Sequence, residues 1–141
     1  MLACKRYVFD NQELEDVANY SNVGLKMQKI LDPIHNFMYV TSQSKYDVEK
    51  NGYNFDEIIR KAESNLNGKI HYVEISDAVK ENAVILKRGL KKFYRSGDTI
   101  FAYCVTNNCI MVTSDDEIKE CCNKVGCQCL LITSNSELIT K

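Results

Sequence analysis

The chain is short of the residues on which several classes of protein depend. Of its 141 residues only 6 are glycine and 1 is proline, and tryptophan is absent. The glycines form neither G-x-G-x-x-G nor G-x-x-x-x-G-K, which argues against a nucleotide-binding loop. No apolar run reaches the roughly 18 residues of a membrane span, and residues 1–6 do not resemble a secretory signal. We therefore expect a cytoplasmic protein without a membrane partner.

Cysteine is plentiful, with 7 residues, but its distribution favours neither disulfides nor zinc. The count is odd, and Cys104, Cys109 and Cys129 fall on apolar strand or helix faces, which indicates reduced thiols in the cytoplasm. The cysteines at residues 121–129 lack the paired C-x₂-C spacing of a zinc site. Alternating burial along the chain explains them better.

The pattern of apolar residues predicts an α/β fold. Strands are expected at residues 5–9, 37–40, 70–75, 109–113 and 127–132. Helices are expected at about residues 12–31 with a break near 21, 42–51, 54–66, 77–94, 96–107 and 115–124. Strands separated by helices need crossover connections, so we expect a mainly parallel sheet of four to five strands in a three-layer α/β/α arrangement. One domain should span residues 1–133, followed by a loosely ordered tail, 134–141.

Four aspartates stand where an apolar run ends or a helix begins, namely Asp10, Asp47, Asp98 and Asp115. In an open parallel sheet, ligand sites lie at the carboxyl ends of the strands. Carboxylates gathered there repel one another until a cation arrives, and their hard oxygens suit Mg²⁺ or Mn²⁺. An isolated aspartate in such a place usually caps a helix, a role that is compatible with metal binding.

In order and spacing these acids resemble the PIN domain, a metal-dependent nuclease fold of about this size. The segments that carry the resemblance span nearly the whole chain: Val8–Asp10, Tyr39–Thr41, Asp47–Lys50, Gly97–Ile100 and Val112–Ile118. Residues 39–52 are especially similar to PIN nucleases that trim ribosomal RNA precursors. Asp47 stands where those proteins usually have glutamate, and Asn11-Gln12 replaces their usual hydroxyl residue and asparagine.

The resemblance implies a fold of the PIN type and an endoribonuclease that leaves a 5′-phosphate and a 3′-hydroxyl. We assign Asp10, Asp98 and Asp115 as metal ligands, direct or through water, and Asp47 as the fourth acid. Glu117 is a further candidate ligand. Weaker candidates support the carboxylates by hydrogen bonds or, for the serine, contact a water or phosphate: Asn11, Thr113 and Ser114. The alternative is a catalytically weak PIN-like module that binds RNA or a protein partner.

A basic stretch without any acid precedes Asp98 and comprises Lys87, Arg88, Lys91, Lys92 and Arg95. Three of these share one helix face at i, i+4, i+8 spacing. Such runs are often only solvated, but the proximity of Asp98 favours contact with the RNA backbone. With a net charge of −1, RNA affinity has to come from a local patch of this kind.

The sequence leaves the biological partner open. A toxin held by an antitoxin and a housekeeping RNA-processing factor with a ribosome-assembly partner both fit a bare domain. A homodimer through the apolar face of residues 12–31 is compatible with the pattern, although a core role explains that face equally well.

Overall fold

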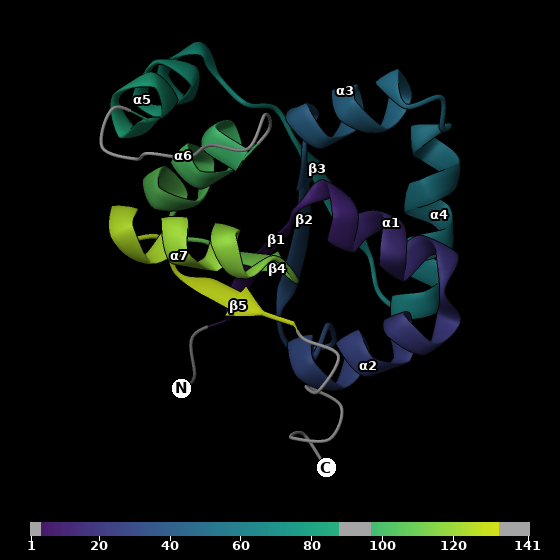
Figure 1. Ribbon diagram of the computed structural model, residues 1–141. Helices are drawn as coiled ribbons and strands as arrows, with labels where there is room; N and C mark the ends of the chain where they lie inside the picture. The colour runs from purple at the N-terminus through teal and green to yellow at the C-terminus, as the bar shows by residue number, and fades with distance from the viewer. Residues whose placement is uncertain (1–3, 88–96, 133–141) are drawn as a thin grey trace.

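The computed structural model describes residues 4–87 and 97–132, apart from the side chains of residues 84–87 and 97–98. In these ranges five parallel strands form one sheet: β1 (Arg6–Phe9), β2 (Phe37–Thr41), β3 (Ile70–Val73), β4 (Ile110–Thr113) and β5 (Cys129–Leu131). The strand order is β3-β2-β1-β4-β5 (Figure 1). Residues 88–96, with four members of the basic stretch, and the tail 134–141 lie outside the described residues.

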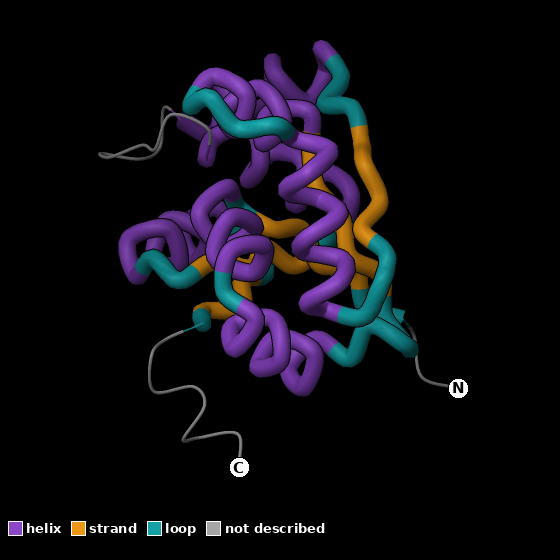
Figure 2. The backbone as a smooth tube through the Cα atoms, turned by 90° about the vertical axis from the view of Figure 1, so that its right-hand side faces the viewer, coloured by secondary structure: helices purple, strands orange, loops and turns teal. Residues whose placement is uncertain are grey.

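Seven helices connect the described strands: α1 (Asn11–Asn19), α2 (Ser21–Leu31), α3 (Ser42–Lys50), α4 (Phe55–Leu66), α5 (Asp77–Lys87), α6 (Gly97–Asn107) and α7 (Asp116–Val125). They lie on both sides of the sheet, α1, α2 and α4 on one face and α6 and α7 on the other, with α5 packed outside α6 (Figures 1 and 2). The three-layer α/β/α prediction is confirmed, and the sheet is entirely parallel.

Polar residues, three of them at strand ends, start the helices where the sequence predicts. The side chains of Asp10, Thr41, Asn54 and Asp115 each accept a hydrogen bond from a backbone N–H in the first turn of the following helix. At the other end of α4, Asn67 adopts the left-handed conformation (φ 52°) that closes a helix. The caps at Asp10, Thr41 and Asp115 mark where β1, β2 and β4 give way to the helices that follow them.

Two apolar cores hold the layers together. On the first face Phe9 and Val112 of the central strands pack against the helices through Leu14, Met27 and other fully buried side chains. On the second face Val8 and Met111 pack against α6 and α7, whose contribution includes buried cysteines. Alternating strand residues therefore face opposite cores, which is the pattern of a sheet covered on both sides.

The chain order creates a switch point beside β1. From β1 the chain builds outward to β2 and β3, and it then crosses to the other side of β1 to form β4 and β5. Helices that leave β1 and β4 consequently go to opposite faces, so a crevice opens between the ends of these two strands. None of the helices in the described ranges combines the length and apolar character that a bilayer span requires.

Candidate functional site

Asp10 is the first residue after β1 and lies at the base of this crevice. Its own N–H continues the sheet by donating to the Val112 carbonyl at 3.1 Å. Its carboxylate accepts from the backbone N–H of Glu13 at 2.7 Å and thereby caps α1. Only 6% of Asp10 is exposed, so a charged group is held in the interior by the sheet on one side and the helix on the other.

Thr113, the last residue of β4, ties two of the predicted acids together. Its hydroxyl donates to the second carboxylate oxygen of Asp10. The same hydroxyl accepts from the backbone N–H of Asp115 at 3.2 Å. Thr113 is fully buried, so this link between β1 and the β4 end is protected from water. The carboxylate of Asp115 in turn accepts a hydrogen bond from the Glu117 N–H at 2.8 Å, which orients it.

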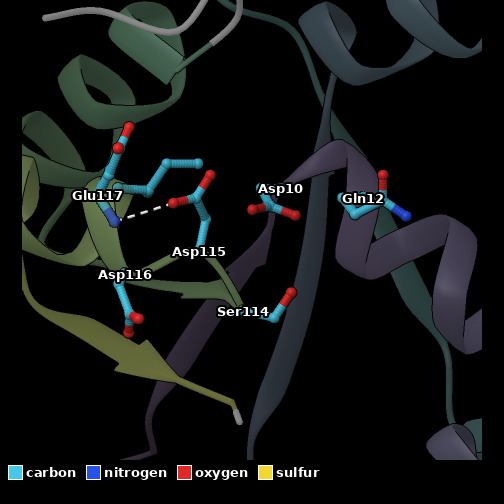
Figure 3. A pocket seen from close by; sticks show the side chains of 7 residues that line it. Asp10, Gln12, Ser114, Asp115, Asp116 and Glu117 are labelled. Atoms are coloured by element: carbon cyan, nitrogen blue, oxygen red, sulfur yellow. Dashed lines mark hydrogen bonds between the residues drawn. The ribbon is translucent and has the colours of Figure 1, made fainter. Parts of the chain in front are cut away.

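An open pocket of about 780 Å³ lies above these groups, lined by Asp10, Gln12, Ser114, Asp115, Asp116, Glu117 and Ile118. Asp10, Ser114 and Asp115 stand together near the middle of the view, whereas Asp116 points away from them (Figure 3). The pocket therefore gathers two of the four predicted aspartates, together with the additional candidate Glu117 and the predicted supporting residue Ser114.

Asp47 occupies a different position, on helix α3. Its carboxylate accepts from the side-chain amide of Asn11 at 2.7 Å and from that of Gln43 at 3.3 and 3.4 Å. Asp47 does not line the pocket, but Asn11 directly follows Asp10 and so connects the two places. Asn11 contacts an acid as predicted, and the acid is Asp47.

Asp98 falls in the first turn of α6, as the sequence predicts, but its side chain lies outside the described part of the structure. Its neighbour Thr99 donates to the Gln43 side chain at 3.5 Å. Since Gln43 also holds Asp47, the start of α6 is fastened to the same polar chain. The backbone thus brings Asp98 to the end of the sheet where the other three aspartates stand.

Burial shapes the electrostatics of this end of the sheet. It raises the pKa of Asp10 to about 6, even though the hydrogen bonds from Thr113 and Glu13 act in the opposite direction, and the charge of Asp115 raises it further. Burial also raises the pKa of Glu13 to about 7, with the neighbouring charge of Asp10 as the second cause. The negative charges of these carboxylates are therefore only partly balanced by the hydrogen bonds and cations around them.

Glu13 is the site residue that the sequence reading missed. It is 2% exposed, and Ser114, which lines the pocket, is near enough to lower its pKa while burial raises it. The signal was present, because Glu13 shares a helix stripe with Leu14, Val17 and Ala18, all buried. An acid on the apolar stripe of an amphipathic helix needs a polar reason to be there.

The carboxylate oxygens of the pocket are ligands of the type that a hard divalent cation prefers. Asp10 and Asp115 present carboxylate oxygens to one open pocket, and Mg²⁺ is commonly bound by one or two carboxylates while it retains several waters. One buried oxygen, Oε2 of Glu13, has no hydrogen-bond partner. Within the described ranges, however, no three acidic, histidine or cysteine side chains are placed to bind one ion together. The described acids could therefore supply two ligands to such an ion, and not a full set.

Comparison with known proteins identifies the architecture. No family model matches the sequence, and no curated protein matches it significantly. A PilT N-terminus domain protein from the hyperthermophilic archaeon Sulfolobus solfataricus P2 aligns over 96% of this chain and 92% of its own, with a TM-score of 0.58 and 10% identity. A chain of VapBC2 from Rickettsia felis, solved bound to a DNA fragment from its promoter, aligns over 92% of this chain and 97% of its own, with a TM-score of 0.59 and 16% identity.

The fold and the pocket define a parallel α/β protein with an acidic crevice at its switch point. Within that class, the chain has the fold of the PilT N-terminus, or PIN, domain. At 10% and 16% identity the two matches establish the fold, and the sequence-based recognition is confirmed at that level.

Proposed function

We propose that the protein is a PIN-type endoribonuclease that uses Mg²⁺ or Mn²⁺ to hydrolyse RNA phosphodiester bonds, leaving a 5′-phosphate and a 3′-hydroxyl. One observation carries the proposal: the buried Asp10 carboxylate faces an open pocket, beside Asp115, at the switch point of a PIN fold. A buried acid with a raised pKa in a crevice is the kind of group that functional sites contain.

Each residue of the site has a separate task in this proposal. Asp10 and Asp115 would hold the ion, and Asp98, Asp47 and Glu117 are the acids available to complete its ligands. A divalent ion bound there supplies Lewis acidity to the phosphoryl group and a water of lowered pKa. Thr113 keeps the Asp10 carboxylate turned toward the pocket through its buried hydroxyl, and no covalent nucleophile is needed.

RNA would reach the pocket along the α5 side of the molecule. The stretch Lys87, Arg88, Lys91, Lys92 and Arg95 leads to Gly97, where α6 and the Asp98 position begin. Each cation in such a stretch neutralises about one phosphate without reading sequence. This contact stays a prediction from the sequence, because these side chains lie outside the described residues.

The direct test is cleavage of labelled single-stranded and structured RNA by the purified full chain with Mn²⁺, Mg²⁺ or EDTA. Asp10→Asn and Asp115→Asn are expected to abolish metal-dependent cutting, and since asparagine caps helices as well as aspartate, both variants should fold. Asp56→Asn removes an exposed acid at the start of α4 and serves as the matched control. Cutting that persists in EDTA, or in the Asp10 variant, would contradict the proposal.

The second candidate is a module that binds RNA or a protein partner without cutting. Two observations favour it: amide donors already satisfy Asp47, and the described acids do not form a group of three ligands. Such a module would bind RNA in a gel-shift assay and would cleave it with none of the metals.

An antitoxin partner is the more specific of the two biological settings, because VapBC2 is among the structures that share this fold. A ribosome-assembly partner and a homodimer are further proposals. In each of these settings we expect the protein to act in the cytoplasm. Light scattering on the purified chain measures the oligomeric state. Growth arrest on expression that requires Asp10 would favour the toxin.

A further inference from the structure

One face of α3 leads from the candidate site to the surface of the molecule. Four residues of this face share the spacing i, i+3, i+4, i+7, which places them on one side of a helix: Gln43, Tyr46, Asp47 and Lys50. Asp47 accepts from the Asn11 amide at 2.7 Å, and Gln43 accepts from the Thr99 hydroxyl at 3.5 Å. These contacts join the face to the first turns of α1 and α6, where the candidate site lies.

Tyr46 is the aromatic residue of this face, and it is 60% exposed. Its ring takes no part in either of the two cores that cover the sheet. The Lys50 ammonium lies over the ring, 6.0 Å from its centre. A single exposed aromatic residue is ordinary on a protein surface. This one is distinguished by the cation over its ring and by its position next to Asp47 in the chain.

Lys50 brings a positive charge to the helix face that carries Asp47. It is exposed and stands in the last turn of α3, where the helix dipole favours a cation. In the part of the chain that the structure describes, the ion pairs join other residues, so no described carboxylate occupies its ammonium. The helix dipole therefore explains the charge of Lys50, but it does not explain the aromatic ring that Lys50 covers.

An aromatic ring beside an ammonium group matches the chemistry of one nucleotide. Every base has a π-face that can stack on an aromatic side chain, and every phosphate is an anion that a lysine can neutralise. A base inside a duplex is already stacked on its neighbours, so only an unpaired base can offer its face to the ring. The contact with Lys50 is weak at an exposed site, so a base can replace the ammonium and leave it to bind the phosphate.

The neighbours of Tyr46 favour RNA over a protein partner. On the surface of α3 the ring is flanked by two exposed charged residues, Glu49 and Lys50. The centre of a protein interface is depleted in charged residues, whereas a surface that binds nucleic acid combines aromatic rings with cations.

We propose that Tyr46 and Lys50 form a subsite for one unpaired nucleotide of the RNA, with the base stacked on the Tyr46 ring and a phosphate on the Lys50 ammonium. This inference rests on the proposed nuclease function and defines its substrate class, which is RNA that is single-stranded beside the cut site. The subsite lies on α3 and is separate from the basic stretch that precedes α6.

The test measures binding of the full chain to a fluorescent single-stranded oligoribonucleotide and to a hairpin of the same length, by anisotropy in EDTA so that no metal-dependent cutting occurs. Tyr46→Ala should weaken single-strand binding about 5- to 100-fold, and Tyr46→Trp should preserve it. Lys50→Gln should reduce the slope of log K against log salt by about 0.7. With Mn²⁺, the KM for cleavage should rise with Kd in Tyr46→Ala, while kcat stays within about twofold of the wild type.

Two matched controls make the same changes away from the site. Tyr20→Ala removes a ring that is 58% exposed, lies beyond the far end of α1 and makes no capping hydrogen bond through its side chain. Lys29→Gln removes a cation from the last turn of α2, as Lys50→Gln does from α3. Both controls should bind RNA as the wild type does. An abasic nucleotide placed at each position in turn should weaken wild-type binding at one position and leave Tyr46→Ala unaffected there.

Three results would overturn the inference. Wild-type binding by Tyr46→Ala would remove the stacking, and an equal loss for the hairpin would remove the preference for an unpaired base. Unchanged binding with an altered mass in light scattering would make the ring a contact between copies of the chain.

Failure of the proposed function gives a different pattern. If the wild type cuts no RNA with any metal but its binding depends on Tyr46, the nuclease is refuted and the subsite belongs to a binding module. If the wild type cuts RNA and Tyr46→Ala has an unchanged Kd and KM, the nuclease stands and the subsite is refuted.

Discussion

Two carboxylates at the same end of the sheet, those of Asp10 and Asp47, are satisfied in different ways. Asp10 is buried, and its donors are one backbone N–H and the Thr113 hydroxyl. Asp47 is half-buried, and its donors are the side-chain amides of Asn11 and Gln43. Asp10 lines the open pocket and Asp47 does not.

The difference indicates where a cation would gain most. Around Asp10, burial and the nearby charge of Asp115 leave negative charge uncompensated, as the pKa raised to about 6 reflects. Around Asp47, two neutral amides already supply hydrogen bonds, and these remain whether or not an ion is present. We therefore propose Asp10 as the centre of the site and Asp47 as a supporting acid, whose hydrogen bonds link α3 to α1 and, through Gln43, to the start of α6.

The strongest test of this ranking is Asp10→Asn. The change removes the charge but keeps an N-cap of equal quality, so the fold should persist. RNA cleavage should fall to background, a larger loss than the 10- to 100-fold typical of a group that only supports a ligand. Circular dichroism confirms the fold, and a cleavage time course measures the loss. Wild-type activity in this variant would show that Asp10 is not the central acid of the site.

The next largest effect is expected for Thr113→Val, which keeps the shape of the side chain and removes its hydroxyl. Asp10 loses a donor in a buried place, and the Asp115 N–H loses an acceptor in a partly buried one. We expect about 1–3 kcal/mol of lost stability and a 10- to 100-fold fall in kcat. Chemical denaturation and kinetics measure the two effects. Thr106→Val, on the far turn of α6, is the control for the same change.

The fold was predictable from the sequence because its signals are local. Strand runs, the Asn67 stop and the aspartates at strand ends each depend on a few adjacent residues, and all are confirmed. The helix predicted over residues 77–94 is seen as far as Lys87, where the described range ends.

Partnerships within the site were less predictable because they join distant segments. The hydrogen bond from the Asn11 amide to the Asp47 carboxylate joins residues 36 positions apart. The hydrogen bond from the Thr113 hydroxyl to the Asp10 carboxylate joins residues 103 positions apart. The role of Glu13 could not be read from the sequence, because its spacing from Asp10 also fits a capping box, and only the pairing of β1 with β4 shows that the Asp10 N–H is bonded to Val112 instead. Sequence pattern thus located the candidate acids, but the hydrogen bonds that rank them needed three dimensions.

A smaller effect concerns the pH dependence of the metal-free protein. The folded-state pKa of Asp10, about 6, lies above its ordinary value of 3.8, so the folded state holds the proton more tightly than the unfolded chain. This group therefore favours folding below about pH 4, and its contribution is lost as the pH rises to about 6. Relative to Asp10→Asn, the wild type should lose up to about 3 kcal/mol across that window.

Denaturant titrations of both proteins at pH 4, 5, 6 and 7 in EDTA measure this difference. If the two proteins keep a constant stability difference from pH 4 to 7, Asp10 is not a strained carboxylate. Added Mn²⁺ should stabilise the wild type more at pH 7 than at pH 5, because the ion competes with the proton for the same oxygens.

The smallest loss is expected for Asp47→Asn, which makes the same chemical change as Asp10→Asn at the other place. An asparagine at residue 47 can still accept from Asn11 through its carbonyl, so the link between α3 and α1 should survive. Cleavage should fall less than about 10-fold, below the range of a directly supporting group. Measured side by side under one metal concentration, a loss as complete as that of Asp10→Asn would mean that Asp47 turns into the pocket when the ion binds. The two carboxylates would then be equal ligands, and the amides of Asn11 and Gln43 would be donors that hold Asp47 only in the metal-free state.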